Sequence, residues 1–360
     1  MTELNIFELH EELPLFELDV HHLDNDQRDR LFQYLDVNNN SVLTVDEFRR
    51  LFKLLFYSTK YRENHLNDKL ETKLLNALNI KDYETIDVQK FNIIWEKWIK
   101  VILKPQSALV IVDVQNDFIA NSGSMTVKSG QTIVPVINEL IQTINFDVIV
   151  YTYDWHPWNH CSFIDSVHNT DIDRSLIETF GKNIADIGVG DQVIYEKYPK
   201  VVQHLCPKHC AQDSDGAKLY KDLVISENSM FIAKGMDPDI DSHSAFANNS
   251  KGKGSETELH NKLQQLGITD IYVTGVLYEY CVGQTAMDGL NRGYRTVIIE
   301  DAVRELSCSL KDDMKNCLIK NNAYFIKSKD VLDLVNSTVR SVQMALVLAN
   351  KVFNNNNKLS

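Results

Sequence analysis

The chain has 360 residues, a length that predicts about two domains, and its 44% hydrophobic and 24% charged content excludes a disordered or fibrous chain. Asp and Glu outnumber Lys and Arg by 50 to 37, and the resulting net charge of −13 opposes binding to nucleic acid or to anionic membranes. The chain has only six cysteines, it has no apolar run of the ~20 residues that cross a bilayer, and it shows no secretory leader. We therefore expect a cytoplasmic protein with reduced thiols, with the nucleus as an alternative location.

Residues 1–104 predict an all-helical domain. Leu, Phe and Trp recur there three or four residues apart, with almost no β-branched runs. This periodicity predicts four helices, at Asp26–Leu35, Val45–Phe56, Asn67–Leu78 and Val88–Val101. Pro105 ends the last of them, because proline disfavours a helical residue before it, and so places the domain boundary between residues 104 and 105.

A loop between the first two helices resembles the calcium loop of an EF-hand. Oxygen ligands recur there at the spacing that a hard cation requires, and the expected Ca²⁺ ligands are Asp36, Asn38, Asn40, the Val42 carbonyl, Thr44 and Glu47. Ser41 stands where such loops have a glycine, at a cost of up to ~1 kcal/mol, and only two of the ligands carry charge. Calcium binding and a purely structural loop therefore both stay open.

A second, degraded loop follows from Asn79 to Lys90. Ile86 occupies the same position in it as Leu43 in the first loop, the position through which paired EF-hand loops contact each other. Lys90 replaces the terminal carboxylate, so we expect no metal in the second loop. On the simpler interpretation, the two loops only tie a four-helix lobe together.

From residue 105 onward, short β-branched runs alternate with amphipathic helices, which predicts βαβ units around a buried parallel sheet. The predicted strands are Ala108–Val114, Phe146–Tyr153, Met230–Ala233, Ile271–Thr274 and Thr296–Ile299. The predicted helices are Ile133–Ile144, Glu256–Leu266, Val282–Asn291, Leu310–Asn321 and Ser337–Phe353. We therefore expect an α/β domain over residues 105–353, with three αβα layers and a mainly parallel central sheet, and a disordered tail over residues 354–360.

Polar residues follow the first two predicted strands. Asp113 lies at the carboxyl end of the first strand, where open α/β sheets place their sites. Asp154 and His156 alternate after the second strand, so both side chains leave one face of an extended chain and can reach one ion. With His209 as a third donor, this set suits Zn²⁺, and it also suits Fe²⁺ or Mn²⁺.

A cysteine and a lysine occupy similar places. Cys281 begins a predicted helix directly after a strand, and the helix dipole there is expected to lower the pKa of a thiol and favour the nucleophilic thiolate. The backbone amides of Leu277 and Cys281 would then form an oxyanion hole. Lys234 follows the strand Met230–Ala233 and brings an ammonium group to another strand end.

Taken together, these motifs resemble the isochorismatase-like cysteine hydrolases, and among them the nicotinamidases. The resemblance covers residues 107–330 through the ordered motifs D-V-Q-N-D-F, D-W-H-P-x-x-H-x-S-F, C-P-x-H-C, K-G, D-S-H-S-A-F and Y-C-V-x-x-T-A-x-D. It implies a catalytic triad of Asp113, Lys234 and Cys281. It implies that the metal ligands are Asp154, His156 and His209. The residues implied to contact the substrate are Phe118, Tyr280 and Leu277.

The resemblance also implies a cis peptide bond between Val276 and Leu277. One residue departs from the family pattern: Cys206 stands where the family usually has tryptophan. One aromatic wall of the pocket is therefore expected to be missing or to be supplied by Trp158.

The implied activity is hydrolysis of nicotinamide to nicotinic acid and ammonia, through a thioester on Cys281, in NAD salvage. In this mechanism the metal ion holds the pyridine nitrogen, and Asp113 moves the proton. Two alternatives stay open: another amidase of the superfamily that acts on carbamoyl or acyl amides, and a calcium-responsive binding protein with an inert hydrolase domain. Homo-oligomerisation also stays open.

Overall fold

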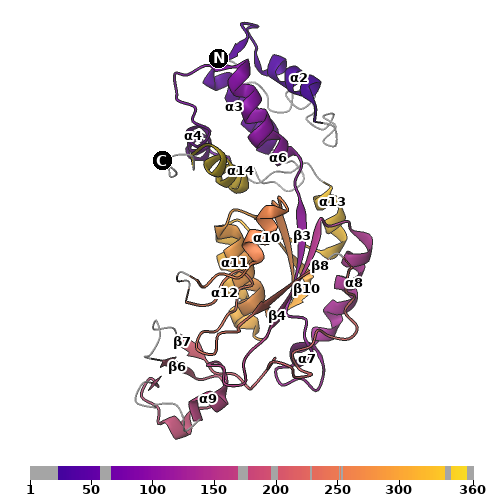
Figure 1. Cartoon of the computed structure of the whole chain (residues 1–360), viewed down its shortest axis with the longest axis vertical. Helices are drawn as coiled ribbons and strands as arrows, with labels where there is room; N and C mark the ends of the chain where they lie inside the picture. Colours follow the sequence, from indigo (N-terminus) through magenta and orange to yellow (C-terminus); the bar gives the residue numbers. More distant parts are fainter. Residues whose placement is uncertain are drawn as a thin grey trace. The chain divides into compact units, whose positions relative to one another are not determined.

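The computed structural model describes residues 23–56, 66–168, 177–195, 202–227, 229–250, 252, 254–336 and 342–354. The chain divides into two compact units (Figure 1), one formed by residues 1–105 together with 336–360 and the other by residues 106–335. The expected disordered tail lies, apart from Asn354, outside the described residues.

The first unit is helical. Its helices are α2 (Asn25–Leu35), α3 (Val45–Phe56), α4 (Asp68–Ala77) and a continuous run of α5 (Val88–Ile94), η2 (Trp95–Ile99) and α6 (Lys100–Leu103). Side-chain oxygens cap these helices where the sequence supplies them. Asp24 accepts a hydrogen bond from the Gln27 amide, and Asn67 accepts one from the Leu70 amide, both at 3.0 Å.

Two short strands pair the loops of the helical unit. Strands β1 (Val42–Leu43) and β2 (Ile86–Asp87) are antiparallel, and their register places Leu43 opposite Ile86. Both of these side chains are fully buried. The pairing of the two loops predicted from these positions is therefore present.

Helix α14 (Val342–Ala349) and the turn η8 (Asn350–Asn354) also belong to the helical unit. Val342, Ala345 and Ala349 are buried in the same core as the α3 and η2 side chains. The expectation that residues 337–353 belong to the hydrolase domain therefore differs from the structure. An amphipathic pattern shows that a helix buries one face, but it does not show which core receives that face.

The second unit is built on a six-stranded sheet of order β11-β10-β9-β3-β4-β8, in which every neighbouring pair is parallel. Its strands are β3 (Ser107–Val112), β4 (Val148–Asp154), β8 (Ser229–Lys234), β9 (Asp270–Val276), β10 (Arg295–Arg304) and β11 (Tyr324–Ile326). The predicted parallel α/β architecture is confirmed. The sequence did not predict β11, whose three residues are too few to show a periodic pattern.

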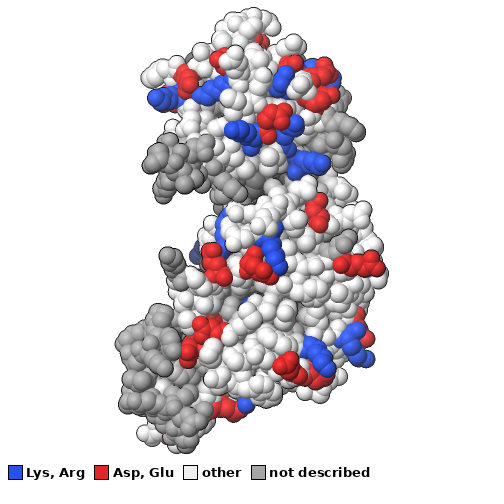
Figure 2. Space-filling model, viewed as in Figure 1, with Lys and Arg blue, Asp and Glu red and all other residues white. Residues whose placement is uncertain are grey.

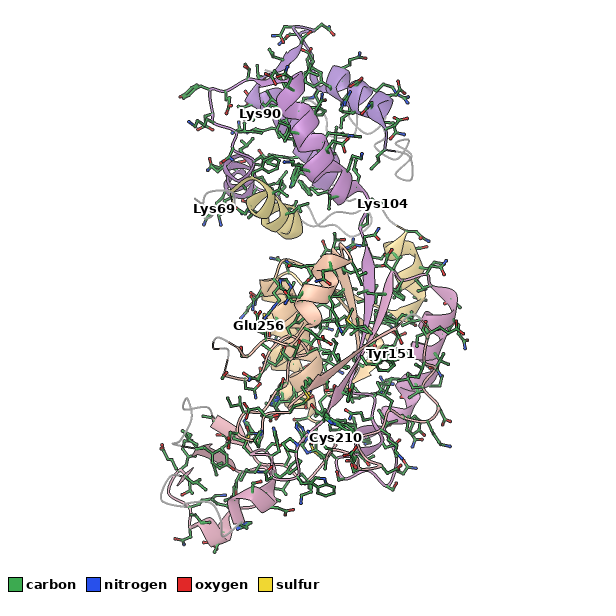
Figure 3. All side chains as sticks on the ribbon, viewed as in Figure 1. Lys69, Lys90, Lys104, Tyr151, Cys210 and Glu256 are labelled. Carbon is green, nitrogen blue, oxygen red and sulfur yellow. The ribbon has the colours of Figure 1, made fainter. Side chains whose placement is uncertain are left out.

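Helices cover both faces of this sheet. Helices α10 (Leu259–Gln265), α11 (Gly283–Asn291) and α12 (Cys308–Lys320) lie on one side of it, and α8 (Ile133–Thr143) and α13 (Val331–Val335) lie on the other (Figure 1). Side chains fill the space between the layers (Figure 3). A separate three-stranded antiparallel sheet, which the sequence did not predict, consists of β5 (Ile177–Glu178), β6 (Gln192–Tyr195) and β7 (Val202–His204).

The parallel sheet brings the predicted site residues to one edge. In the β4–β8 register, Asp154 is the partner of Lys234, so two strand-end charges are neighbours. Gly275 on β9 has a φ of 110°, and a β-carbon there would lie 2.0 Å from the Val112 carbonyl oxygen on β3. Only glycine allows these two strand ends to approach so closely.

Two surface properties bear on the expected partners. Among the described residues, no helix has the length and apolar character needed to span a membrane. On the face shown in Figure 2, the coloured Lys and Arg side chains are interspersed with Asp and Glu.

Candidate active site

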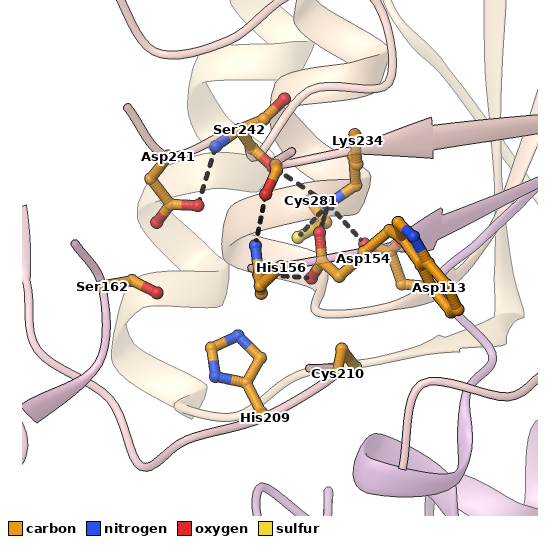
Figure 4. A network of polar contacts seen from close by, with 12 residues as sticks. Asp113, Asp154, His156, Ser162, His209, Cys210, Lys234, Asp241, Ser242 and Cys281 are labelled. Carbon is orange, nitrogen blue, oxygen red and sulfur yellow. Dashed lines mark hydrogen bonds and ion pairs between the residues drawn. The ribbon is translucent and has the colours of Figure 1, made fainter. Parts of the chain in front are cut away.

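Lys234 stands at the centre of a buried cluster of charges (Figure 4). Its Nζ lies 2.6 Å from Asp154 Oδ1, 2.8 Å from Asp113 Oδ2 and 3.4 Å from the sulfur of Cys281. It also donates to the Ser242 carbonyl oxygen at 3.0 Å. The structure therefore brings the three sequence-predicted triad residues together and joins them to Asp154 through one ammonium group.

Asp113 is held as an acceptor beside the thiol. The Thr152 hydroxyl donates to Asp113 Oδ1 at 2.7 Å, and one oxygen of the same carboxyl group lies within 4.8 Å of the Cys281 sulfur. Burial raises the pKa of Asp113 to about 6, against the opposing effect of Lys234 and with a further increase from Asp154. A carboxyl group with this pKa can take a proton near neutral pH and return it.

The thiol pKa corrects one prediction. Burial raises the pKa of Cys281 well above its usual value, although Lys234 opposes this effect and Asp113 and Asp154 add to it. The helix position was expected to lower this pKa. Complete burial and two neighbouring carboxylates, however, destabilise the thiolate more than the helix dipole stabilises it. This direction favours the protonated thiol, beside the Asp113 carboxyl group.

Asp154, His156 and His209 form a candidate metal site. One donor atom from each lies within 4.8 Å of the others, and all three residues are buried. His156 Nδ1 lies 2.8 Å from the Gly235 carbonyl oxygen, and His209 Nδ1 lies 2.8 Å from the Pro207 carbonyl oxygen. An imidazole that donates through Nδ1 presents the lone pair of Nε2, so this donor set fits a divalent cation.

Gly235 fixes the position of His156. Its φ is 65°, and a β-carbon there would lie 2.3 Å from His156 Cε1. We expect Gly235→Ala to displace this ring and weaken metal binding by about 10- to 100-fold, measured by competition with a chelator.

The matched control is Gly267→Ala. Gly267 has a φ of 70°, but a β-carbon there would meet no atom within 4 Å. This variant carries the same left-handed backbone cost of about 1 kcal/mol and should leave metal affinity unchanged. Equal metal affinity in the two variants would contradict the positioning role of Gly235.

A pocket of about 400 Å³ opens onto these groups. All three predicted substrate-binding residues, Phe118, Leu277 and Tyr280, line it, and so do Cys281 and the three metal-site residues. The Val276–Leu277 peptide bond beside the pocket is cis, as the resemblance implies.

Trp158 does not line the pocket. It is 60% exposed and stacks instead beneath the Lys208 ammonium group, so it does not supply the wall that Cys206 leaves open. Two other rings line the pocket: His243 stacks on Tyr280 with ring centroids 5.4 Å apart, and His204 lies edge-on to Tyr280 at 6.3 Å. Neither histidine was predicted to have a role. The motif D-S-H-S-A-F was the only signal for His243, and β7, which carries His204, is too short to predict.

Two carboxylates that were not predicted as site residues, one buried and one half-buried, hold the pocket walls. Asp117 accepts hydrogen bonds from the backbone amides of Ser124 at 3.1 Å and Cys210 at 2.7 Å. Glu279 accepts from the amide of Leu306, at 3.1 Å, and from that of Ser307, at 2.6 Å. Ser124 and Leu306 line the pocket, so both carboxylates act through the loops they anchor.

The six predicted calcium residues lie in one closed loop of the helical unit. Asp36 accepts from the amides of Asn40 and Ser41, at 3.1 and 2.8 Å. Glu47 accepts from the amide and hydroxyl of Thr44, at 2.8 and 2.9 Å. Ser41 adopts a φ of 65°, the left-handed conformation expected at the glycine position.

Comparison with known proteins places this site in a family. Residues 107–330, more than half of the chain, match the isochorismatase domain. The chain belongs to the isochorismatase family. Among the relatives in this family, the nicotinamidase of Acinetobacter baylyi is 32% identical over 199 residues, which cover 55% of this chain and 81% of that protein.

Two solved structures of the family are similar to the α/β unit. The nicotinamidase pyrazinamidase of Acinetobacter baumanii is 33% identical, with a TM-score of 0.54, and the match covers 64% of this chain and all of that one. The yeast nicotinamidase bound to the inhibitor nicotinaldehyde is 27% identical, with a TM-score of 0.51, and the match covers 62% of this chain and all of that one.

Proposed function

We propose that the chain is a nicotinamidase, which hydrolyses nicotinamide to nicotinic acid and ammonia in the salvage of NAD. The observation that supports it most strongly is the Lys234 ammonium, which contacts the Cys281 sulfur, the Asp113 carboxylate and a carboxylate of the candidate metal site. The family relatives with this activity add support. A cytoplasmic location is part of the same proposal.

In the proposed mechanism, Asp113 takes the thiol proton as the Cys281 sulfur attacks the amide carbon. The backbone amides of Leu277 and Cys281 hold the oxyanion, and Lys234 offsets the negative charge that stays in the buried site. Asp113 then gives its proton to the departing nitrogen, which leaves as ammonia. A water molecule, deprotonated by Asp113, attacks the thioester; nicotinic acid leaves and the thiol is restored.

Asp154, His156 and His209 would hold a divalent ion, with Zn²⁺ proposed and Fe²⁺ or Mn²⁺ equally compatible with these donors. Such an ion would supply a Lewis-acid contact that orients the ring nitrogen of the substrate. Phe118 and Tyr280, which line the pocket, would contact the ring itself.

The mechanism predicts an acid limb in the pH profile. Asp113 must be ionised to accept the thiol proton, and its pKa is raised to about 6. As the pH falls below about 6, the protonated fraction grows, and kcat/KM should fall about tenfold for each further pH unit. Metal content measured at each pH separates this effect from loss of the ion. A flat profile between pH 7 and 4 at constant metal content would contradict the role of Asp113.

A substrate panel tests the proposed function. We expect the purified full chain to release ammonia from nicotinamide with a kcat/KM well above that for N-carbamoyl amines or simple acyl amides. A preference for carbamoyl substrates would favour another amidase of the superfamily. Metal-replete, folded protein that hydrolyses none of them would favour a binding protein with an inert hydrolase domain.

We also propose that the Asp36–Glu47 loop binds one Ca²⁺ and that the second loop binds none. Asp36 and Glu47 supply the two charged ligands, and both are buried in a loop that is already closed. Calorimetric titration of the full chain should therefore give one calcium ion per chain. A stoichiometry of two would contradict the assignment of the second loop. No calcium binding at millimolar concentration would make the first loop purely structural.

A further inference from the structure

Helix α14 enters the helical unit from a distant part of the sequence, and it buries residues at a regular spacing. Val342, Ala345 and Ala349 are 4%, 0% and 0% exposed, and they lie at positions i, i+3 and i+7 of one helix face. This is the spacing with which amphipathic target helices anchor in hydrophobic grooves. Two of the three anchors are alanines, which allow the α14 backbone to approach its neighbours closely.

A specific hydrogen bond marks the centre of this contact. Trp98 donates from Nε1 to the Ala345 carbonyl oxygen at 2.8 Å, and both residues are fully buried. The Trp98 ring packs edge-on against Phe52 and Phe56 of α3, with centroids 6.0 and 6.3 Å apart. Helix α14 contacts α4, which precedes the second loop, and η2, which follows it, so the helices on either side of the second loop form the groove that receives α14.

The second loop holds the far end of the same segment. Asn79, the first residue of that loop, donates from Nδ2 to the Phe353 carbonyl oxygen at 3.0 Å. Lys90, its last residue, places its ammonium 2.8 Å from the Asn79 carbonyl oxygen and 2.8 Å from Glu84 Oε1. The Asn79 side chain, at the position of the first ligand in an EF-hand loop, therefore contacts the C-terminal segment. The Lys90 ammonium joins the two ends of the second loop.

We propose that the EF-hand-like lobe, residues 23–105, binds this chain's own C-terminal helix α14 as its target, in the helix-in-groove manner. The occupant is an intramolecular segment, so the groove is closed to any other amphipathic helix while α14 is bound. Binding in cis is favoured because the chain supplies α14 at a high effective concentration. This inference does not depend on the chemistry of the α/β unit.

A labelled peptide of residues 342–354 tests this proposal by fluorescence anisotropy against full-length variants. Ala345→Asp puts a carboxylate into the apolar contact and should release α14, because a buried unpaired charge is costly. The matched control is Asn350→Asp, which adds the same charge on an exposed position of the same segment. We expect the peptide to bind the Ala345→Asp protein at least about tenfold more tightly than the wild type or the control.

Two outcomes would overturn the proposal. One is equal peptide affinity in all three proteins, with the far-UV circular dichroism of the wild type retained as evidence of intact folding. The other is a loss of far-UV helical signal in the Ala345→Asp protein greater than one short helix accounts for, because α14 would then be an integral core helix. Ala349→Asp provides a second release variant at an equally buried position and should behave as Ala345→Asp does.

Discussion

Cys281→Ala should reduce kcat for nicotinamide by at least about 10⁴-fold, because the variant has no atom that can form the thioester. The side chain is small and buried against Lys234, so its truncation should leave the fold and the metal site in place. Steady-state ammonia release, with metal content and circular dichroism measured on the same sample, checks this prediction.

The control for this variant is Cys161→Ala, which removes another buried sulfur. Cys161 does not line the pocket, and its thiol hydrogen-bonds weakly to Gln203 at 3.8 Å. We expect its activity to stay within about threefold of the wild type, since the removed atom touches none of the reacting groups. Appreciable amidase activity in folded Cys281→Ala protein would exclude Cys281 as the nucleophile.

Lys234→Met should have the second-largest effect. The substitution removes a buried cation and leaves two buried carboxylates, Asp113 and Asp154, without their counter-charge. Breaking a buried ion pair in this way costs about 3–5 kcal/mol of folding free energy, and we expect kcat to fall by at least about 10³-fold. Chemical denaturation and ammonia release measure the two effects separately.

A double variant separates the structural from the catalytic role of Lys234. Adding Asp113→Asn to Lys234→Met removes one of the two unbalanced charges, so part of the lost stability should return while activity stays absent. The surface control is Lys262→Met, which breaks only an exposed pair with Glu258 and should change stability by less than about 1 kcal/mol. Near-wild-type activity in folded Lys234→Met protein would contradict the account of the triad.

The active-site constellation could be predicted because it lies at strand ends. The carboxyl ends of parallel strands meet at one edge of a sheet, and Asp113, Asp154 and Lys234 each stand at such an end. Periodicity located all five predicted strands, since buried strands read as apolar runs. The approximate positions of these residues in the fold therefore followed from local sequence, whereas their joint roles were implied by the family resemblance.

Features that depend on contacts between distant segments could not be predicted. The pKa of Cys281 is set by complete burial beside charges from other strands, whereas the sequence shows only its helix position. The contacts of His204 and His243 with Tyr280 depend on strand β7 and on a loop that are both distant from Tyr280 in the sequence. Likewise, the apolar stripe of α14 is visible in the sequence, but the core that it joins is not.

Ammonia release from nicotinamide by the purified full chain, before and after treatment with a chelator, tests the central claim most directly. We predict equal amounts of ammonia and nicotinic acid, loss of both after metal removal, and recovery when a divalent ion is restored. Folded, metal-replete protein that releases no ammonia from nicotinamide would contradict this account.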